Sequence, residues 1–476
     1  MRWRVRGWLP GWLRGWLRRA VGRRERVVPV VPPAGRRRWE RAAPDDWASR
    51  LHLLYLRHRD RVQPAYFARS GDYRMPRRGL PRVWRWYALD VGLGSVRLLW
   101  RTGRAVRAAV GVPLRRQAWQ LWRLSVSLPA RPEHYYTFEW YRPERRARAG
   151  EYLHRYETKG GLYAMLASRP DLEAVAPLTD KVGFAGHAAR AGLPVVPTLA
   201  VVRPGQPPAG VRLPGADLFV KPAGGRGGRG AQKWSYLAGS DSFRASSAGA
   251  PAELPRTVLL DRLASAGAAV PWLVQPCLVN HPELADLALD AAATCRVVTI
   301  LDEAGDPEPV VAIFRMPAVP GAVVDNLHRG GIAAPVEIGT GRLGPATGYA
   351  VAGPPTRFAH HPVTGAVITG RALPQWSAVL ALTVRAHRAF APRVLVGWDI
   401  SVGPDGPVLV EGNEQPGVDG LQRLHDRPLG SHRFGELLAW HLAARFPEGG
   451  RDGGRVGAGR DGDRPDGAPP GAIMRR

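Results

Sequence analysis

Cysteine is scarce in this chain of 476 residues, which contains only Cys277 and Cys295. The two residues form no C-x-x-C pair, and neither has a histidine at the spacing of a metal site. We therefore expect neither a disulfide framework nor a zinc site. A reducing, cytoplasmic environment is the setting that this cysteine usage favours.

Long apolar runs are also missing. No run approaches the roughly 18 residues that a transmembrane helix requires. The N-terminus is rich in arginine, but it lacks an apolar core of about 7–15 residues followed by a cleavage site. We therefore expect neither a membrane-spanning helix nor a signal peptide.

Acidic residues are few in the first third of the chain. Residues 1–160 contain 37 Lys and Arg against 12 Asp and Glu, whereas the remainder contains 31 against 28. Tryptophan follows the same division, with 12 of the 17 before residue 160. The sequence thus predicts a basic, aromatic-rich front attached to a near-neutral globular body, and the chain as a whole is long enough for two to four domains.

The front, residues 1–130, is predicted to be partly helical, for example over 46–59 and 96–110. Trp8, Trp12 and Trp16 are four residues apart and would lie near one face of a helix. Such a segment suits an anionic membrane surface, and this would place the protein peripherally at the inner face of a membrane. The segment would also fit the phosphate backbone of a nucleic acid. The alternative is that it is a poorly ordered basic leader. No groove-reading motif is present, so nucleic acid is the weaker candidate partner.

Near the far end, two β-rich runs, 394–402 and 408–412, flank a Gly/Pro/Asp cluster. This pattern predicts a hairpin. If the turn centres on Asp405, Asp399 faces Glu411, and Asn413 shares the face of Glu411. Oxygen-only ligands of this kind suit Mg²⁺ or Mn²⁺. The alternative is an ordinary surface hairpin, because a one-residue slip in register would scatter the trio.

A glycine-rich stretch, 223–230, has five glycines in eight residues and follows Lys221-Pro222. Its backbone N–H groups are suited to cradle phosphates, although it matches neither the P-loop nor the Rossmann pattern. A plain linker is the alternative.

Two arginines, Arg296 and Arg315, lie on predicted strands joined by an acidic, glycine-containing turn at 302–306. Their positions mirror each other about the turn, so we expect them close together on a hairpin. Two such cations on buried strands are costly without anions. They are expected either to bind a substrate anion or to pair with Asp or Glu.

The order of these parts carries a resemblance that covers roughly residues 131–445. The chain resembles ATP-grasp enzymes, and most closely the group named sugar-transfer-associated ATP-grasp proteins; its Asn326–Gly331 run is also similar to a loop of ribosomal-protein glutamate ligases. The motifs that carry the wider resemblance are Thr294-x-Arg-x-Val-Thr299, His361-Pro-x-Thr-Gly365, Leu373-Pro-x-Trp376 and Gly397-Trp-Asp399.

The resemblance implies an α+β ATP-grasp fold, with two α+β halves gripping ATP behind a small α/β lobe, over residues 131–445. Residues 1–130 would be a mostly helical basic extension, and 446–476 a disordered tail. The site residues that the resemblance implies fall into three groups. Lys181, Lys221, Gly225, Gly227, Gly228 and Gln275 would bind ATP; Arg296, Arg315 and Asn326 would be catalytic; Asp399, Glu411 and Asn413 would hold Mg²⁺, with Mn²⁺ as the alternative.

By the same resemblance, the expected activity is that of an ATP-dependent carboxylate–amine ligase acting through an acyl phosphate, on cell-surface carbohydrate or a related small molecule or peptide. The expected partners are ATP, a carboxylate substrate and an amine acceptor. Two alternatives stay open: an ATP-grasp kinase, and a membrane-associated nucleotide-binding protein without ligase activity.

Overall fold

The structure is a computed structural model. The Trp8–Trp16 helix and the 46–59 helix predicted for the front, Gly225 of the glycine-rich stretch, and the predicted disordered tail all lie outside the residues it describes. The described residues are 92–127, 131–155, 158–159, 163–166, 172–206, 208–224, 227–246, 253–265, 270–349 and 353–445.

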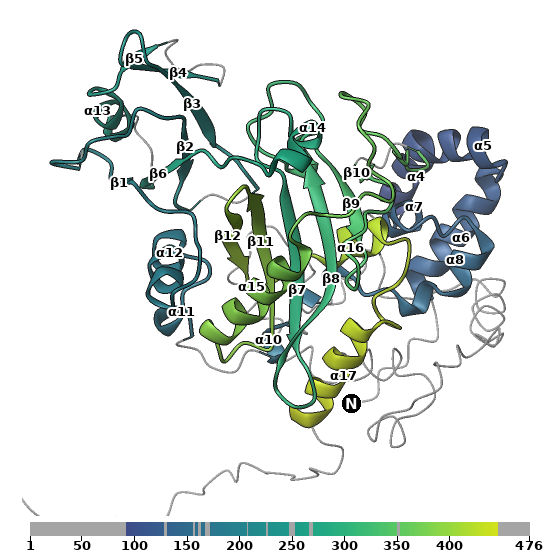
Figure 1. The fold of residues 1–476 in the computed structure, drawn as a ribbon. Helices are drawn as coiled ribbons and strands as arrows, with labels where there is room; N and C mark the ends of the chain where they lie inside the picture. The colour runs from purple at the N-terminus through teal and green to yellow at the C-terminus, as the bar shows by residue number, and fades with distance from the viewer. Residues whose placement is uncertain are drawn as a thin grey trace, which may run out of the picture.

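Two antiparallel sheets, each of six strands, form the body of the protein (Figure 1). The first sheet has the strand order β1-β6-β2-β3-β4-β5 and packs on helix α13 (Leu259–Ala264). Its core contains Val220, Trp234 and Phe243. Its strands are β1 (Ala200–Val202), β2 (Leu218–Pro222), β3 (Gln232–Leu237), β4 (Ser242–Ala245), β5 (Leu254–Pro255) and β6 (Trp272–Pro276).

The second sheet carries the predicted hairpin and has the strand order β10-β9-β8-β7-β11-β12. Both of its long hairpins connect strands that are neighbours in sequence, which keeps their turns short. The strands are β7 (Thr294–Leu301), β8 (Pro307–Met316), β9 (Ile332–Val336), β10 (Thr347–Gly348), β11 (Leu395–Gly403) and β12 (Gly406–Asn413).

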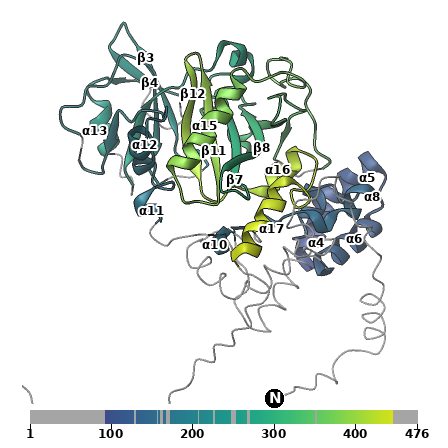
Figure 2. The same cartoon turned by 60° about the horizontal axis from the view of Figure 1, so that its bottom comes forward.

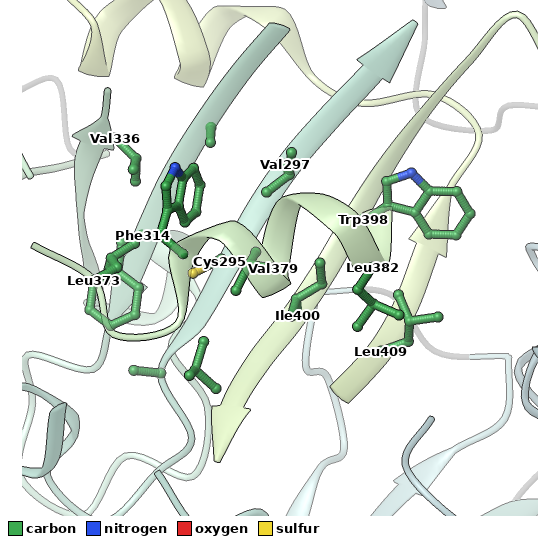
Figure 3. Close-up of a cluster of buried hydrophobic side chains, with 14 of the residues drawn as sticks. Cys295, Val297, Phe314, Val336, Leu373, Val379, Leu382, Trp398, Ile400 and Leu409 are labelled. Atoms are coloured by element: carbon green, nitrogen blue, oxygen red, sulfur yellow. The ribbon is translucent and has the colours of Figure 1, made fainter. Parts of the chain in front are cut away.

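One face of the second sheet is largely apolar where helix α15 (Trp376–Ala389) crosses it, with one buried polar pair, Thr299 Oγ1 and His387 Nδ1 at 2.7 Å. Figure 3 shows Val379 and Leu382 of this helix beside Val297, Ile400 and Leu409 of the strands. Side chains alternate along a strand, so every second residue along each strand points toward α15. This apolar layer stabilises the sheet, and the charged side chains of the strands lie on the opposite face.

The opposite face changes from apolar to polar along its length. At one end, Val298, Ile300 and Val311 pack against α16 (Val418–Leu424) and α17 (Arg433–Arg445). Further along the same strand faces stand Arg296 and Arg315. The switch in residue type on one face marks where the hydrophobic core ends and a polar site begins.

Helices precede the first sheet. They include α12 (Lys181–Arg190), whose N-terminus is capped by the Asp180 carboxylate; this acid accepts hydrogen bonds from the N–H groups of residues 182 and 183. The others are α4 (Gly94–Leu98), η3 (Leu99–Gly103), α5 (Arg104–Val110), α6 (Leu114–Ser127), α7 (His134–Thr137), α8 (Pro143–Ala147), η4 (Ala149–Glu151), α10 (Tyr163–Leu166) and α11 (Leu172–Val175).

The helix expected over 96–110 is present as the continuous run α4-η3-α5. Its buried Val106 joins a cluster with Leu121, Tyr136 and Trp140, so this cluster includes residues from both sides of position 130. The domain boundary placed there stays a prediction. Within the described ranges, none of the helices combines the length and apolar character needed to cross a bilayer.

Candidate active site

The β11–β12 hairpin places Asp399 directly opposite Glu411, as the sequence predicted, and Asn413 opposite Gly397. The expected turn centre, however, is wrong. Gly403 pairs with Gly406, so the turn is centred between residues 404 and 405, and that register alone would bring Asp399 opposite Val410. An irregularity between residues 399 and 400 adds one residue to β12 and restores the Asp399–Glu411 pair.

Asp399 is held by two guanidinium groups. Arg296 donates from Nε to Oδ1 at 2.6 Å and from Nη2 to Oδ2 at 2.5 Å, and Arg315 donates from Nη2 to Oδ2 at 2.9 Å. The Arg296 Nη2 also lies 3.9 Å from Glu411 Oε1. Of the two expectations for the arginines, this structure contains the pairing with carboxylates.

The register of the β7–β8 hairpin differs from simple mirror symmetry. Arg296 pairs with Ile313, and Arg315 pairs with Thr294, so the two arginines are offset by two residues. A shift of two residues leaves both side chains on the same face of the sheet. This is why both still reach Asp399 from neighbouring strands.

Two further polar residues complete the cluster, and neither received a role from the sequence. Thr294 Oγ1 accepts a hydrogen bond from Arg315 Nε at 2.9 Å and donates to the buried carboxylate of Asp325. Asp325 Oδ2 lies 3.4 Å from Arg315 Nε. The available signal was alternation along β7, which places Thr294 on the face of Arg296, but nothing in the sequence brings residue 325 to that strand.

The electrostatics of the cluster separate its acids. Burial alone would raise the pKa of Asp399, but Arg296 and Arg315 outweigh it and hold this pKa far below its usual range. Burial, reinforced by the charge of Asp399, raises the pKa of Glu411. Burial also raises the pKa of Asp325. One acid is thus firmly ionised, and the acid opposite it is under strain from its neighbour's charge.

The two predicted lysines approach this cluster from other elements. Lys181 is the first residue of α12, and its Nζ lies 3.4 Å from the carbonyl oxygen of Pro222 at the end of β2. Burial lowers the pKa of Lys221 to about 8; Lys181 adds to this, whereas Glu411 and Asp399 oppose it. The pKa of Lys221 therefore depends on the charge of Lys181 and on the charges of Glu411 and Asp399 in the hairpin.

The glycine-rich stretch meets the loop that contains Asn326. A side chain at Gly228, where φ is +69°, would come within 3.0 Å of Val324, and one at Gly227 would come within 3.4 Å of the Asn326 amide nitrogen. Asn326 itself caps the short helix η7 (Leu327–Arg329) by accepting from the His328 N–H at 2.8 Å. The positive φ at both positions favours glycine, and at Gly228 an added Cβ would also press against Val324.

Gln275 stands apart from the residues above. It lies on β6 opposite Phe219 of β2, and its buried amide donates to the Val196 carbonyl oxygen at 3.4 Å. Gln275 therefore lies on the strand next to the one that contains Lys221. Its side-chain amide, however, is hydrogen-bonded to the backbone of the segment before β1.

The donor set of the hairpin fits a hard divalent cation. Asp399 and Glu411 face each other, a like-charge pairing that destabilises a sheet unless a cation offsets it. The Asn413 amide nitrogen is buried without a hydrogen-bond partner, so this amide is not committed to the fold. Across the described ranges, no group of three His, Cys, Asp or Glu side chains is placed to hold a metal. The ligand set predicted from the sequence, two carboxylates and an amide, is of another kind and stays a prediction.

Comparison with known proteins gives one family match. The model of the family described as "Sugar-transfer associated ATP-grasp" matches residues 169–431, more than half of the chain. None of the curated proteins matches.

Solved structures with a similar fold include a D-alanyl-alanine synthetase A from Vibrio cholerae, at 13% identity and a TM-score of 0.34, covering 58% of this chain and 67% of that one. They also include a biotin carboxylase from Campylobacter jejuni in complex with β-γ-ATP, at 13% identity and a TM-score of 0.32, covering 56% of this chain and 46% of that one. Likenesses at this level say nothing about substrate or reaction.

Proposed function

Because the chain belongs to the sugar-transfer-associated ATP-grasp family, we propose that it is an ATP-dependent carboxylate–amine ligase that activates its acid as an acyl phosphate. The observation that carries the proposal is the convergence of Asp399, Glu411, Arg296 and Arg315 on one polar end of the second sheet. Phosphoryl transfer needs positioning and charge neutralisation more than a nucleophilic side chain, and this cluster is built of such groups.

We propose that Asp399, Glu411 and Asn413 hold Mg²⁺, or Mn²⁺ in its place. A divalent ion bound there supplies positive charge that neutralises phosphate oxygens. Glu411 is suited to the role because its raised pKa reflects burial and the nearby Asp399 charge, and a bound cation relieves both. Asn413 contributes a neutral oxygen donor, which keeps the charge of the ligand set low.

ATP is assigned to the space between the two sheets. Lys181 and Lys221 are proposed to bind its phosphates, and the backbone at Gly227 and Gly228, together with Gly225, is proposed to cover them. Gln275 marks the strand β6 proposed to border the adenine. The pKa of about 8 at Lys221 keeps most of this side chain cationic at neutral pH, which suits an anionic ligand.

The proposed reaction has two steps. A carboxylate oxygen of the acid attacks the γ-phosphorus, the new O–P bond forms, and the bond to the β-phosphate oxygen breaks to release ADP. An amine then attacks the acyl carbon, the C–O bond to phosphate breaks, and the amine loses a proton as the amide forms.

Arg315 and Arg296 are proposed to hold the transferred phosphoryl group and the carboxylate. The pKa of Arg315 is raised, because Asp325 and Asp399 outweigh the effect of burial, so Arg315 stays charged throughout. Asn326 lies on the loop that contacts the glycine-rich stretch and is proposed to orient the acid. The family's description refers to sugar transfer, and we propose that the acid or the amine belongs to a cell-surface carbohydrate or its precursor.

A hydroxylamine trap tests the proposal. The purified protein is mixed with Mg²⁺-ATP, hydroxylamine and a panel of amino acids, uronic acids and peptidyl acids, and hydroxamate and ADP are measured. Hydroxamate that appears with wild type and is lost with Asp399→Asn supports an acyl phosphate and identifies the acid. ADP without hydroxamate, in the presence of a phosphorylated product, would assign the chain to phosphotransferases instead.

A further inference from the structure

The described part of the basic front contains no acidic residue. Residues 92–127 include seven arginines and neither Asp nor Glu. They form a helical hairpin, in which the run α4-η3-α5 packs against α6. No acid within the segment balances this positive charge, which leaves the segment with a net positive field.

Polar contacts fix the inner side of this helical hairpin. The buried Gln117 of α6 donates to the Gly103 carbonyl oxygen at 3.0 Å and to the Val112 carbonyl oxygen at 2.7 Å, and it accepts from the Tyr136 hydroxyl at 2.9 Å. A side chain at Gly103 would lie 2.9 Å from both the Gln117 amide oxygen and the Tyr136 hydroxyl. The two helices are therefore held close together along this side, and the side chains exposed to solvent lie on their other sides.

The outer side carries large apolar groups among the arginines. Leu93, Val96, Trp100 and Trp119 are each more than half exposed. Leu93 and Trp100 are seven residues apart and Val96 and Trp100 are four apart, so the three lie along one side of the first helix. Exposed tryptophan and aliphatic side chains together are unusual on a surface that faces only water.

The arginines are arranged around these tryptophans. The guanidinium carbon of Arg104 lies 3.9 Å from the Trp100 ring centroid, and that of Arg123 lies 5.2 Å from the Trp119 ring centroid. Such stacking holds the cation beside the ring without covering the ring's outer edge. We use the name arginine–tryptophan face for the exposed side chains of the two helices that carry this chemistry, namely Leu93, Val96, Trp100 and Trp119 with Arg97, Arg101, Arg104 and Arg107.

The arginine–tryptophan face is remote from the first sheet, which contains β2 and β6. Figures 1 and 2 both show α4, α5 and α6 grouped at one end of the molecule, with the first sheet at the other. The face is therefore free to bind a partner without blocking β2, β6 or the glycine-rich stretch.

We propose that the arginine–tryptophan face docks on a bilayer surface that contains anionic phospholipids, a function beyond the ligase activity. Tryptophan prefers the headgroup level of a bilayer, where its apolar body and its N–H are both satisfied, and Leu93 and Val96 add apolar area beside it. Arginines around such an apolar patch match the negative surface of an anionic leaflet.

The chain's own N-terminal segment is a poor alternative occupant. Residues 1–91 contain 23 arginines and no lysine, against seven Asp and Glu, so they share the sign of the charge on this face. A nucleic acid would match the charge, but it has no counterpart for exposed leucine and valine. The two candidates are separated in the experiment below.

The test measures cosedimentation of the full chain with sucrose-loaded vesicles. Vesicles of phosphatidylcholine with about one quarter phosphatidylglycerol are compared with pure phosphatidylcholine. The wild type is expected to bind the anionic vesicles, and the binding is expected to weaken as salt rises from 0.1 M to 0.5 M, since the screening length falls from about 10 Å toward 3 Å.

Two variants probe the face separately. Trp100→Ala with Trp119→Ala is expected to reduce the partition coefficient by about tenfold, through loss of interfacial apolar area. Arg97→Gln, Arg101→Gln and Arg107→Gln together are expected to reduce it by about 100-fold, at roughly fivefold per arginine.

Matched controls lie elsewhere on the surface. Val279→Ala with Val367→Ala removes exposed apolar side chains, and Arg190→Gln, Arg203→Gln and Arg262→Gln together remove the same net charge from exposed positions. The controls are expected to bind vesicles like wild type, and all variants are expected to keep the wild-type melting temperature.

The proposal is overturned if both face variants bind anionic vesicles like their controls. It is also overturned if the wild type ignores vesicles of either composition while binding a duplex DNA or RNA through the same arginines. Equal binding of pure phosphatidylcholine and anionic vesicles would contradict the role given to the arginines.

Discussion

Arg296 and Asp399 form a two-point ion pair in which each carboxylate oxygen accepts a separate N–H, at 2.6 and 2.5 Å. Asp399 is buried, and Arg315 shares its second oxygen at 2.9 Å. The carboxylate proposed to bind the metal is therefore already engaged by two guanidiniums. A metal at Asp399 would share this carboxylate with two guanidinium cations, whose positive charge opposes its binding, so the arginines and the metal compete for one acid.

Replacing Arg296 with Gln is expected to change metal binding and turnover in opposite directions. Without the two-point pair, Asp399 is more accessible to a cation, so the affinity for Mn²⁺ in the absence of nucleotide should increase by about tenfold, equivalent to ~1.4 kcal/mol. Ligase turnover should fall, because a guanidinium for the transferring group is lost. Mn²⁺ titration followed by electron paramagnetic resonance measures the affinity.

The matched control is Arg371→Gln, which removes another two-point pair, with Asp286 at 2.5 and 2.7 Å. This control should leave Mn²⁺ affinity unchanged. An Arg296 variant with weaker Mn²⁺ binding than wild type would mean that the arginine supports the metal site instead of competing for it.

Glu411→Gln should stabilise the metal-free protein while removing metal binding. Burial and Asp399 raise the pKa of Glu411, so its ionised form destabilises the folded state; this penalty is absent below the unfolded pKa of about 4.3 and complete above the folded pKa. Because the side chain is partly exposed, we expect a gain of only ~0.5–1 kcal/mol at pH 8.

Urea unfolding at pH 8 and pH 4 measures this effect. The stability difference between Glu411→Gln and wild type should be present at pH 8 and shrink at pH 4. Mg²⁺ should stabilise the wild type but not the variant. A variant less stable than wild type at pH 8 would show that Glu411 is well paired and feels no net strain.

ATP affinity should weaken at alkaline pH because of Lys221. Its pKa is lowered to about 8, first by burial and then by Lys181, so it loses its charge as the pH rises through that value. A charged hydrogen bond to phosphate contributes ~1.5–3 kcal/mol, so the affinity should fall by about tenfold between pH 7.5 and pH 9.5. Lys221→Met should bind ATP weakly and with no such pH dependence.

Calorimetric titration with a non-hydrolysable ATP analogue across this pH range provides the measurement. Lys233→Met, on the neighbouring strand β3, serves as the control and should retain the wild-type pH profile. Retention of the profile in Lys221→Met would assign the titrating group to another residue.

Gly228→Ala should impair ATP turnover more than it impairs folding. At Gly228 the backbone has φ of +69°, and a Cβ would meet Val324 at 3.0 Å, so the glycine-rich stretch should be displaced from the Asn326 loop. Gly210→Ala is the matched control, since φ is +71° with nothing within 4 Å of an added Cβ.

Both alanine variants should lose ~1–2 kcal/mol of stability from the left-handed backbone, as measured by urea unfolding. Only Gly228→Ala should also lower kcat/KM for ATP, by about tenfold or more. Equal activity of the two variants would remove the role given to the contact between Gly228 and Val324.

The sequence predicted that Asp399 and Glu411 face each other, but it did not predict the register that brings them together. Asp399 and Glu411 were paired correctly from alternation about a turn, yet the turn itself was misplaced, and the agreement depends on an extra residue in β12. Arg296 and Arg315 were expected to mirror each other, but the pairing next to the turn is centred on residue 304, and the one-residue register shift between Val298 and Thr299 still leaves them offset by two. Such irregularities are set by packing of the whole sheet, which local residue patterns do not encode.

Residues contributed by loops were harder to predict. Asp325 directly precedes the Asn326–Gly331 run, but its contact with Thr294 and Arg315 depends on how the segment before η7 crosses the end of β7 and β8. The helical cluster that joins Val106 and Leu121 to Tyr136 was likewise invisible, because aromatic residues in a basic segment predict surface attachment as readily as packing.

The most direct test of the proposed chemistry follows the oxygen atom that the acid gives up. With the acid identified by the hydroxylamine trap, its carboxylate is labelled with ¹⁸O, and the phosphate formed during ligation is examined by ³¹P NMR. An acyl phosphate predicts that one ¹⁸O appears in each phosphate released, in a reaction that Asp399→Asn abolishes. Amide formation with unlabelled phosphate would contradict the acyl-phosphate route.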